Sequence, residues 1–74
     1  MSHKVTVIIE KDACGYYAFC PELEGCQSQG DTLEAVFSNI KEAIDLYLET
    51  LTQTEINGLL CKDIFTASVE VKVG

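Results

Sequence analysis

Four cysteines and one histidine are the side chains that first suggest chemistry in this chain of 74 residues. The thiols of Cys14, Cys20, Cys26 and Cys61 are separated by five, five and 34 residues, and the histidine is His3. No C-x-x-C pair occurs, so the spacing fits neither a zinc ribbon nor a dithiol redox motif. A catalytic thiol needs a positioned base, and His3 lies in the N-terminal tail. We therefore predict reduced thiols that behave as small apolar residues, and no metal or cofactor.

Acidic side chains are the second group that could act chemically. Twelve Asp and Glu against five Lys and Arg give a formal net charge of −7. This charge repels nucleic acid, so we expect no direct DNA binding by this chain, and it favours a basic partner. One predicted helix carries four of these residues away from its apolar face: Glu34, Glu42, Asp45 and Glu49. They form either a solvated surface or a docking surface for a basic partner.

The strongest periodic signal runs from Asp31 to Gln53 and predicts one long amphipathic helix. Its apolar residues recur at steps of three and four: Leu33, Val36, Phe37, Ile40, Ala43, Ile44, Tyr47, Leu48 and Leu51. Either Asp31 or Thr32 can serve as the N-cap, and Asp31 would place Glu34 in a capping box. The residues expected to be buried on this face include Ile40, Ile44 and Tyr47.

Four segments have the composition or alternation of β-strands: Val5 to Lys11, Tyr16 to Cys20, Cys26 to Gln29 and Phe65 to Val73. The last segment alternates most regularly, with one apolar and one polar face. The first two are expected to form a hairpin, and Pro21 ends the second because it has no N–H to donate. Gly25 and Gly30 are interpreted as turn residues.

A short second helix is predicted between the long helix and the last strand. Thr52-x-x-Glu55 has the capping-box pattern, and helical spacing follows in Ile56, Leu59 and Leu60. The order β-β-β-α-(α)-β indicates an α+β fold. If the last strand lies beside the first, the right-handed crossover rule favours a four-stranded mixed sheet of order 3-2-1-4, with the long helix on one face.

The length of the chain predicts one domain over residues 1–74, near the lower limit for independent stability. The sheet face away from the helix should still carry apolar or aromatic side chains, so we expect a homodimer or a higher homo-oligomer. No apolar run approaches the length of a membrane span, and the N-terminus lacks the apolar core of a signal peptide. These features predict a cytoplasmic protein.

Several short motifs occur together in a fixed order. They are G-Y-x-A at Gly15–Ala18, P-E-L-x-G-C at Pro21–Cys26, Q-G-D-T at Gln29–Thr32, E-A-I-x-L-Y-L at Glu42–Leu48 and E-V-K-V at Glu70–Val73. In this arrangement the chain resembles the HicB family of antitoxins from bacterial and archaeal toxin–antitoxin pairs. The resemblance implies a partial RNase-H-like fold and the neutralisation of a small basic ribonuclease toxin of the HicA kind. Many members add a DNA-binding segment after the closing strand, and we identify none in these 74 residues.

If such a toxin is the partner, the candidate contacts are acidic and aromatic residues near the hairpin and the following turn: Glu10, Asp12, Tyr16, Glu22 and Glu24. Acidic rim residues speed encounter with a basic surface, and an aromatic anchor supplies desolvated contact area. One alternative is a solitary HicB-like domain that self-associates without a toxin. The other, a cryptic nuclease, is disfavoured because such an enzyme needs carboxylates that converge on two metal ions, with one in the middle of the first strand.

Overall fold

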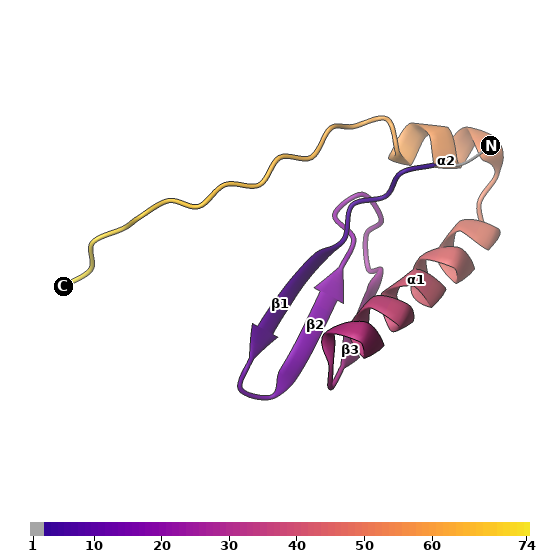
Figure 1. The fold of residues 1–74 in the computed structure, drawn as a ribbon. Coiled ribbons are helices and arrows are strands. Elements are labelled where there is room, and N and C mark those ends of the chain that lie inside the picture. Colours follow the sequence, from indigo (N-terminus) through magenta and orange to yellow (C-terminus); the bar gives the residue numbers. More distant parts are fainter. Residues whose placement is uncertain (1–2) are drawn as a thin grey trace.

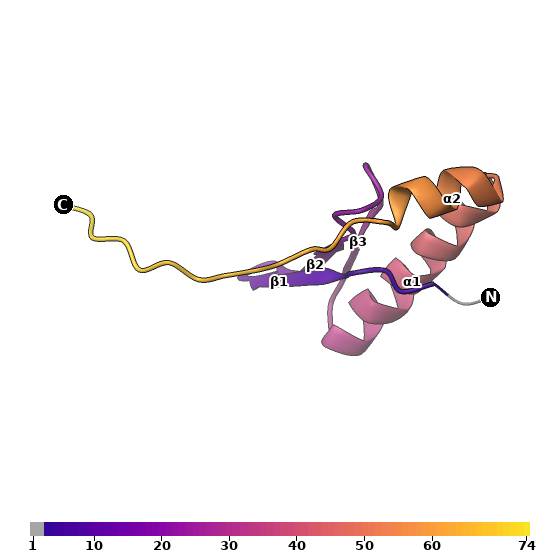
Figure 2. The ribbon, with the colours of Figure 1, turned by 90° about the horizontal axis from the view of Figure 1, so that it is seen from above.

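The computed structural model of the chain describes residues 3–74 and contains three strands followed by two helices (Figure 1). Their bounds are β1 Ile8–Asp12, β2 Gly15–Phe19, β3 Gln27–Gly30, α1 Leu33–Glu49 and α2 Gln53–Leu59. The strands form one antiparallel sheet in the order β1-β2-β3, and α1 lies on one of its faces (Figures 1 and 2). The predicted α+β class is therefore confirmed.

The predicted four-stranded sheet of order 3-2-1-4 is wrong, because Phe65–Val73 forms no strand of the sheet. The segment leaves the end of α2 as an extended chain and runs away from the body of the molecule (Figures 1 and 2). Its side chains are exposed, Phe65 by 90% and Val73 by 94%. Alternation favours an extended backbone with two unlike faces, but it does not specify which strand lies alongside. The three-stranded sheet also falls short of the partial RNase-H-like fold that the resemblance implied.

The first strand begins later than the predicted segment Val5–Lys11. Pairing with β2 starts at Ile8, and continuing the same register would place Thr6 opposite Pro21. Because Pro21 has no N–H, the ladder cannot extend that far in its regular form. The Thr6 N–H instead donates to both carboxylate oxygens of Glu22, each at 3.1 Å. Where the sheet ends, the Glu22 carboxylate thus accepts the hydrogen bond of a backbone N–H that has no partner in the strand ladder.

The two connections between the strands are tight. In the β1–β2 hairpin, Asp12 pairs with Gly15 across a two-residue loop, and the Cys14 N–H donates to Asp12 Oδ1 at 2.8 Å. In the second connection, the Leu23 N–H donates to the Cys20 carbonyl, and Leu23 itself is completely buried. Gly25 has a φ of +81°, a left-handed conformation that favours glycine and confirms its interpretation as a turn residue.

Helix α1 begins after Thr32, whose side-chain oxygen accepts a hydrogen bond from the Ala35 N–H at 3.0 Å. Thr32 rather than Asp31 is therefore the N-cap. The core lies between α1, β2 and the second connection, and it consists of Ala18, Cys20, Leu23, Cys26, Val36, Ile40 and Ile44. The predicted burial of Ile40 and Ile44 is confirmed, whereas Tyr47 is only partly buried. Two residues of the predicted apolar stripe are half exposed, namely Leu33 and Phe37.

The long helix ends at Glu49 and does not continue to Gln53 as predicted. Thr50 is its C-cap, and the Thr50 hydroxyl donates to the Tyr47 carbonyl at 2.8 Å. Thr52 then caps α2, and the predicted capping box with Glu55 is present in both directions. These hydrogen bonds lower the pKa of Glu55. The long helix therefore ends before the Thr52 cap, and the predicted short second helix is confirmed as α2.

Candidate functional site

Three of the five predicted partner contacts lie together at the hairpin end of the sheet. Glu10, Asp12 and Tyr16 line a surface hollow of about 350 Å³, which we call the hairpin hollow. The other residues around it are Cys14, Gly15, Tyr17, Gln29, Gly30 and Asp31. The carboxylates of Glu10, Asp12 and Asp31 are all on exposed residues, so the hollow has an acidic rim.

The side chains of Glu10 and Tyr17 belong to the sheet face turned away from α1. They are paired across β1 and β2, and Ala18, the next residue along β2, is completely buried in the core on the other face. The Tyr17 ring centroid lies 5.9 Å from that of Phe19, and the Tyr17 hydroxyl donates to Gln27 Oε1. The far face of the sheet therefore presents an aromatic pair, fixed in place, beside an acidic rim.

Tyr16 occupies the opposite face. It packs against the core, and Lys11 Nζ lies 5.6 Å from its ring centroid. Tyr17 is consequently the aromatic side chain that stands beside Glu10, and sequence reasoning missed it. Strand alternation contained the signal, since Tyr17 faces Glu10 once the hairpin loop is fixed at two residues.

The remaining two predicted contacts, Glu22 and Glu24, lie in the connection at the other end of β2. Glu22 is only 6% exposed, and its carboxylate accepts hydrogen bonds from the Thr6 N–H and from Cys20 Sγ at 3.5 Å. Glu24 is exposed. The structure thus separates the five residues into a hairpin group of three and a turn group of two, in which Glu22 ties the N-terminal segment to the turn.

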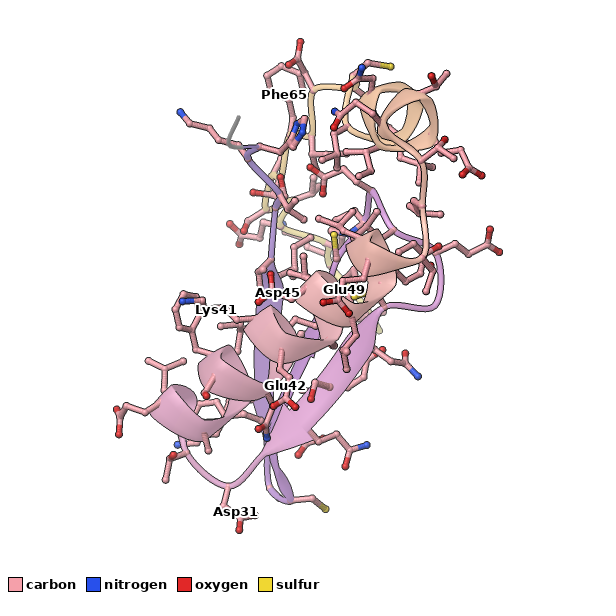
Figure 3. All side chains as sticks on the ribbon, turned by 90° about the vertical axis from the view of Figure 1, so that its right-hand side faces the viewer. Asp31, Lys41, Glu42, Asp45, Glu49 and Phe65 are labelled. Carbon is pink, nitrogen blue, oxygen red and sulfur yellow. The ribbon has the colours of Figure 1, made fainter. Side chains whose placement is uncertain are left out.

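A second acidic surface follows the outer side of α1. Figure 3 shows Glu42, Asp45 and Glu49 on the side of the helix that is turned away from the sheet. All three are exposed, as is Glu34 in the first turn. This placement agrees with the predicted solvent-facing position of these residues. Substitutions on this second acidic surface can therefore serve as controls for substitutions around the hairpin hollow.

The cysteines divide into two buried and two exposed thiols. Cys20 and Cys26 belong to the core, whereas Cys14 and Cys61 are exposed, and all four are unpaired. Burial, with a smaller contribution from the nearby Glu22 carboxylate, raises the pKa of Cys20 to about 11. Burial also raises the pKa of Cys26. A neutral thiol is thus the favoured form at both buried positions.

Protein stability should therefore fall as the pH rises from about 9 to about 11. In this range the unfolded chain has released the Cys20 proton while the folded chain still holds it, so ionisation favours unfolding. Urea unfolding across this range should show a shallower pH dependence for Cys20→Ala than for the unchanged protein. Cys14→Ala is the control, because it removes a thiol at an exposed position. Equal slopes for Cys20→Ala and the unchanged protein would contradict the assignment.

Metal-binding clusters and membrane-spanning helices are both absent from residues 3–74. No group of three or more His, Cys, Asp or Glu side chains in this range is arranged to hold a metal ion. None of the helices in this part of the chain has the length and apolar character required to cross a membrane.

Comparison with known proteins identifies the family. The family model described as the HicB-like antitoxin of bacterial toxin–antitoxin systems matches residues 5–69. The chain belongs to the HicB-like antitoxin family. A UPF0150 protein of Helicobacter pylori is 46% identical over 67 residues, which cover 90% of this chain and 93% of that protein. A UPF0150 protein of Archaeoglobus fulgidus is 39% identical over 72 residues, which cover 96% and 99% of the two chains.

A UPF0150 protein of Synechocystis is more similar over a shorter part, with 56% identity over 50 residues that cover 66% of this chain and 63% of that protein. No solved structure shows a significant match. The resemblance to HicB antitoxins is therefore confirmed. Membership of the family suggests a non-enzymatic antitoxin role in a toxin–antitoxin system, and it implies a toxin as partner in general terms.

Proposed function

We propose that this protein binds and sequesters a small basic ribonuclease toxin of the HicA type. The observation that carries the proposal is the match of residues 5–69 to the HicB-like antitoxin family. The net charge of −7 supports a basic partner, because opposite charges steer the two proteins toward each other and raise the association rate. Binding alone would suffice, since an antitoxin of this kind needs only to cover the toxin.

The proposed contact surface is the face of the sheet that α1 leaves uncovered, around the hairpin hollow. Glu10, Asp12 and Asp31 supply its negative rim. Tyr17 is the proposed anchor because its ring is held by Phe19 and its hydroxyl by Gln27, so little side-chain freedom remains to be lost on binding. An aromatic centre within a charged rim is the arrangement typical of binding hot spots.

The other predicted contact residues, Tyr16, Glu22 and Glu24, have different proposed roles. Tyr16 contributes to the hollow mainly by supporting the hairpin from the core side. Glu24 is proposed as an outlying charge at the opposite end of the sheet. A contact between Glu22 and the toxin stays a prediction. Because the Glu22 carboxylate is buried, a substitution there would first disturb the turn.

The test is the kinetics of binding to any small basic protein that is encoded beside this gene. Glu10→Lys should slow association by about tenfold at low salt, because it reverses a charge on the contact rim. Glu42→Lys is the matched control, since both variants have the same net charge but Glu42 lies on the outer side of α1. Glu24→Lys makes the same change at the other end of the sheet.

Tyr17→Ala should mainly speed dissociation, because the anchor is lost while the charges remain. Tyr17→Phe keeps the ring and should bind almost as the unchanged protein does. Equal effects of Glu10→Lys and Glu42→Lys would show that only overall charge matters and would refute the assigned surface. If no complex forms at micromolar concentration, the toxin-binding function itself is refuted.

The second candidate function is that of a solitary domain that associates only with copies of itself. The exposed apolar side chains of Phe65–Val73 favour it, because a surface of this kind usually has a partner. The absence of any adjacent gene for a small basic protein would favour this function over toxin binding. The two functions are also compatible, since self-association need not occupy the hairpin hollow.

A further inference from the structure

The segment Phe65–Val73, which we call the arm, is an amphipathic extended segment with no strand beside it in the part of the chain that the structure describes. Val69 is 80% exposed and Val71 71% exposed. Its apolar residues alternate with polar ones, so all of them share one side of the extended chain: Phe65, Ala67, Val69, Val71 and Val73. The polar groups of its backbone also remain available to a strand ladder.

The sheet has one open edge that could receive such a strand. β1 and β3 are the two outer strands. On β3, Asn39 Nδ2 of α1 donates to the Gln29 carbonyl at 2.8 Å, so the helix partly occupies that edge. Among residues 3–74, β1 pairs only with β2, and no strand lies against its outer side. β1 therefore offers the backbone groups that a further strand requires.

An apolar hollow lies beside the same edge, between the segment that precedes β1 and helix α1. It has a volume of about 450 Å³, and we call it the edge hollow. Val5 and Val7 line it from the N-terminal segment, and Phe37, Ile44 and Leu48 line it from α1. The other lining residues are His3, Lys41 and Asp45. Phe37 is 51% exposed there although it belongs to the apolar stripe of α1. A strand added beside β1 with its apolar side toward α1 would cover this hollow.

We propose that two copies of this chain exchange their arms, each arm adding as a strand to the outer edge of β1 in the other copy and covering its edge hollow. Every copy then donates one arm and receives one. The exchange forms a closed dimer that leaves neither an arm nor a β1 edge unused. The arrangement does not depend on toxin binding, because the hairpin hollow is lined by other residues.

The number of residues in the proposed interface favours a second copy of this chain as the source of the added strand. The arm has nine residues, β1 has five and the edge hollow is lined by eight. Together they are comparable with the roughly 20–30 residues per partner of a stable interface. The arm also extends well away from its own sheet, as Figures 1 and 2 show, which places it within reach of another molecule.

Sedimentation of the full chain at micromolar concentration should show a species with twice the 8.1 kDa mass of one chain. Val69→Lys with Val71→Lys should weaken the dimer by about 100-fold or more, because two charges would be placed on the buried side of the added strand. Both residues are exposed in the single molecule, so this change should leave its fold intact. Thr66→Lys with Ser68→Lys is the control, since it adds the same charge on the polar side of the arm.

A photo-reactive phenylalanine analogue at position 65 identifies what the arm contacts. In a mixture of nitrogen-14 and nitrogen-15 copies, cross-links should join differently labelled chains and should map to residues 3–12 or to α1. Several results would overturn the proposal: a species of 8.1 kDa only, cross-links confined to one copy, or equal weakening by the two double variants. Cross-links that form only after a basic partner protein is added would assign the arm to that partner instead.

Discussion

Ile40→Ala should lower the free energy of unfolding by about 2–5 kcal/mol, which is the range for removing a large aliphatic side chain from a packed core. Ile40 is completely buried at the centre of α1, between Val36 and Ile44 on the same face of the helix. A small domain has few other contacts to compensate for such a cavity. The loss should therefore be a large part of its total stability.

Leu46→Ala is the matched control for this substitution. Leu46 lies on the same helix and is 58% exposed, so its truncation should change the free energy of unfolding by no more than about 0.5 kcal/mol. Urea unfolding followed by circular dichroism measures both variants, at one fixed protein concentration because dimerisation would make stability depend on concentration. Similar losses for the two variants would mean that the buried face of α1 is misassigned.

The elements that sequence reasoning predicted best are those that depend on local interactions. The capping box of Thr52 and Glu55 joins residues three positions apart, and the buried residues Ile40 and Ile44 follow from helical spacing alone. The predicted helix extended too far because its end was inferred from apolar periodicity. The Thr52 cap in fact starts a new helix there. Leu51 continues the pattern, but Thr50 and Thr52 interrupt the helix on either side of it.

The fourth strand shows the limit of such reasoning. The alternation of Phe65–Val73 is real, and the backbone there is extended, but the neighbour of a strand is a long-range property. A strand that pairs within its molecule and one that pairs with another molecule have the same sequence pattern. In the described structure the arm is exposed and the edge of β1 is open, and these two observations support the proposed pairing between molecules.

The candidate site could be predicted in outline. Glu10 and Asp12 share one face of β1 by simple alternation, and the structure places both at the hairpin hollow. The tyrosine that stands beside Glu10 is Tyr17 and not the adjacent Tyr16, because the phase of β2 depends on the length of the hairpin loop. Burial of the Glu22 carboxylate could not be foreseen, since its partner is the backbone of Thr6, 16 residues away.

Gly30→Ala should destabilise the protein by about 3 kcal/mol, toward the upper end of the range for overpacking. A Cβ atom at Gly30 would lie 2.5 Å from the Val36 backbone nitrogen and 3.0 Å from the Ala35 carbonyl carbon. These atoms belong to the backbone of α1, so no side chain can rotate away and the whole start of the helix must shift. Gly30 is thus required for close packing between β3 and α1, and it is the last residue of β3 rather than the turn residue that its sequence position suggested.

Gly58→Ala makes the same change where space is open. Apart from its chain neighbours and the nearby backbone of α2, nothing in the described structure lies within 4 Å of a Cβ at Gly58, so alanine at this helical position should stabilise the protein by about 0.5–1 kcal/mol. The two variants should therefore shift the urea midpoint in opposite directions. Because Gly30 also lines the hairpin hollow, its variant should also weaken the proposed toxin binding, even where enough folded protein remains for measurement. A Gly30→Ala protein with unchanged stability would show that α1 does not approach β3 this closely.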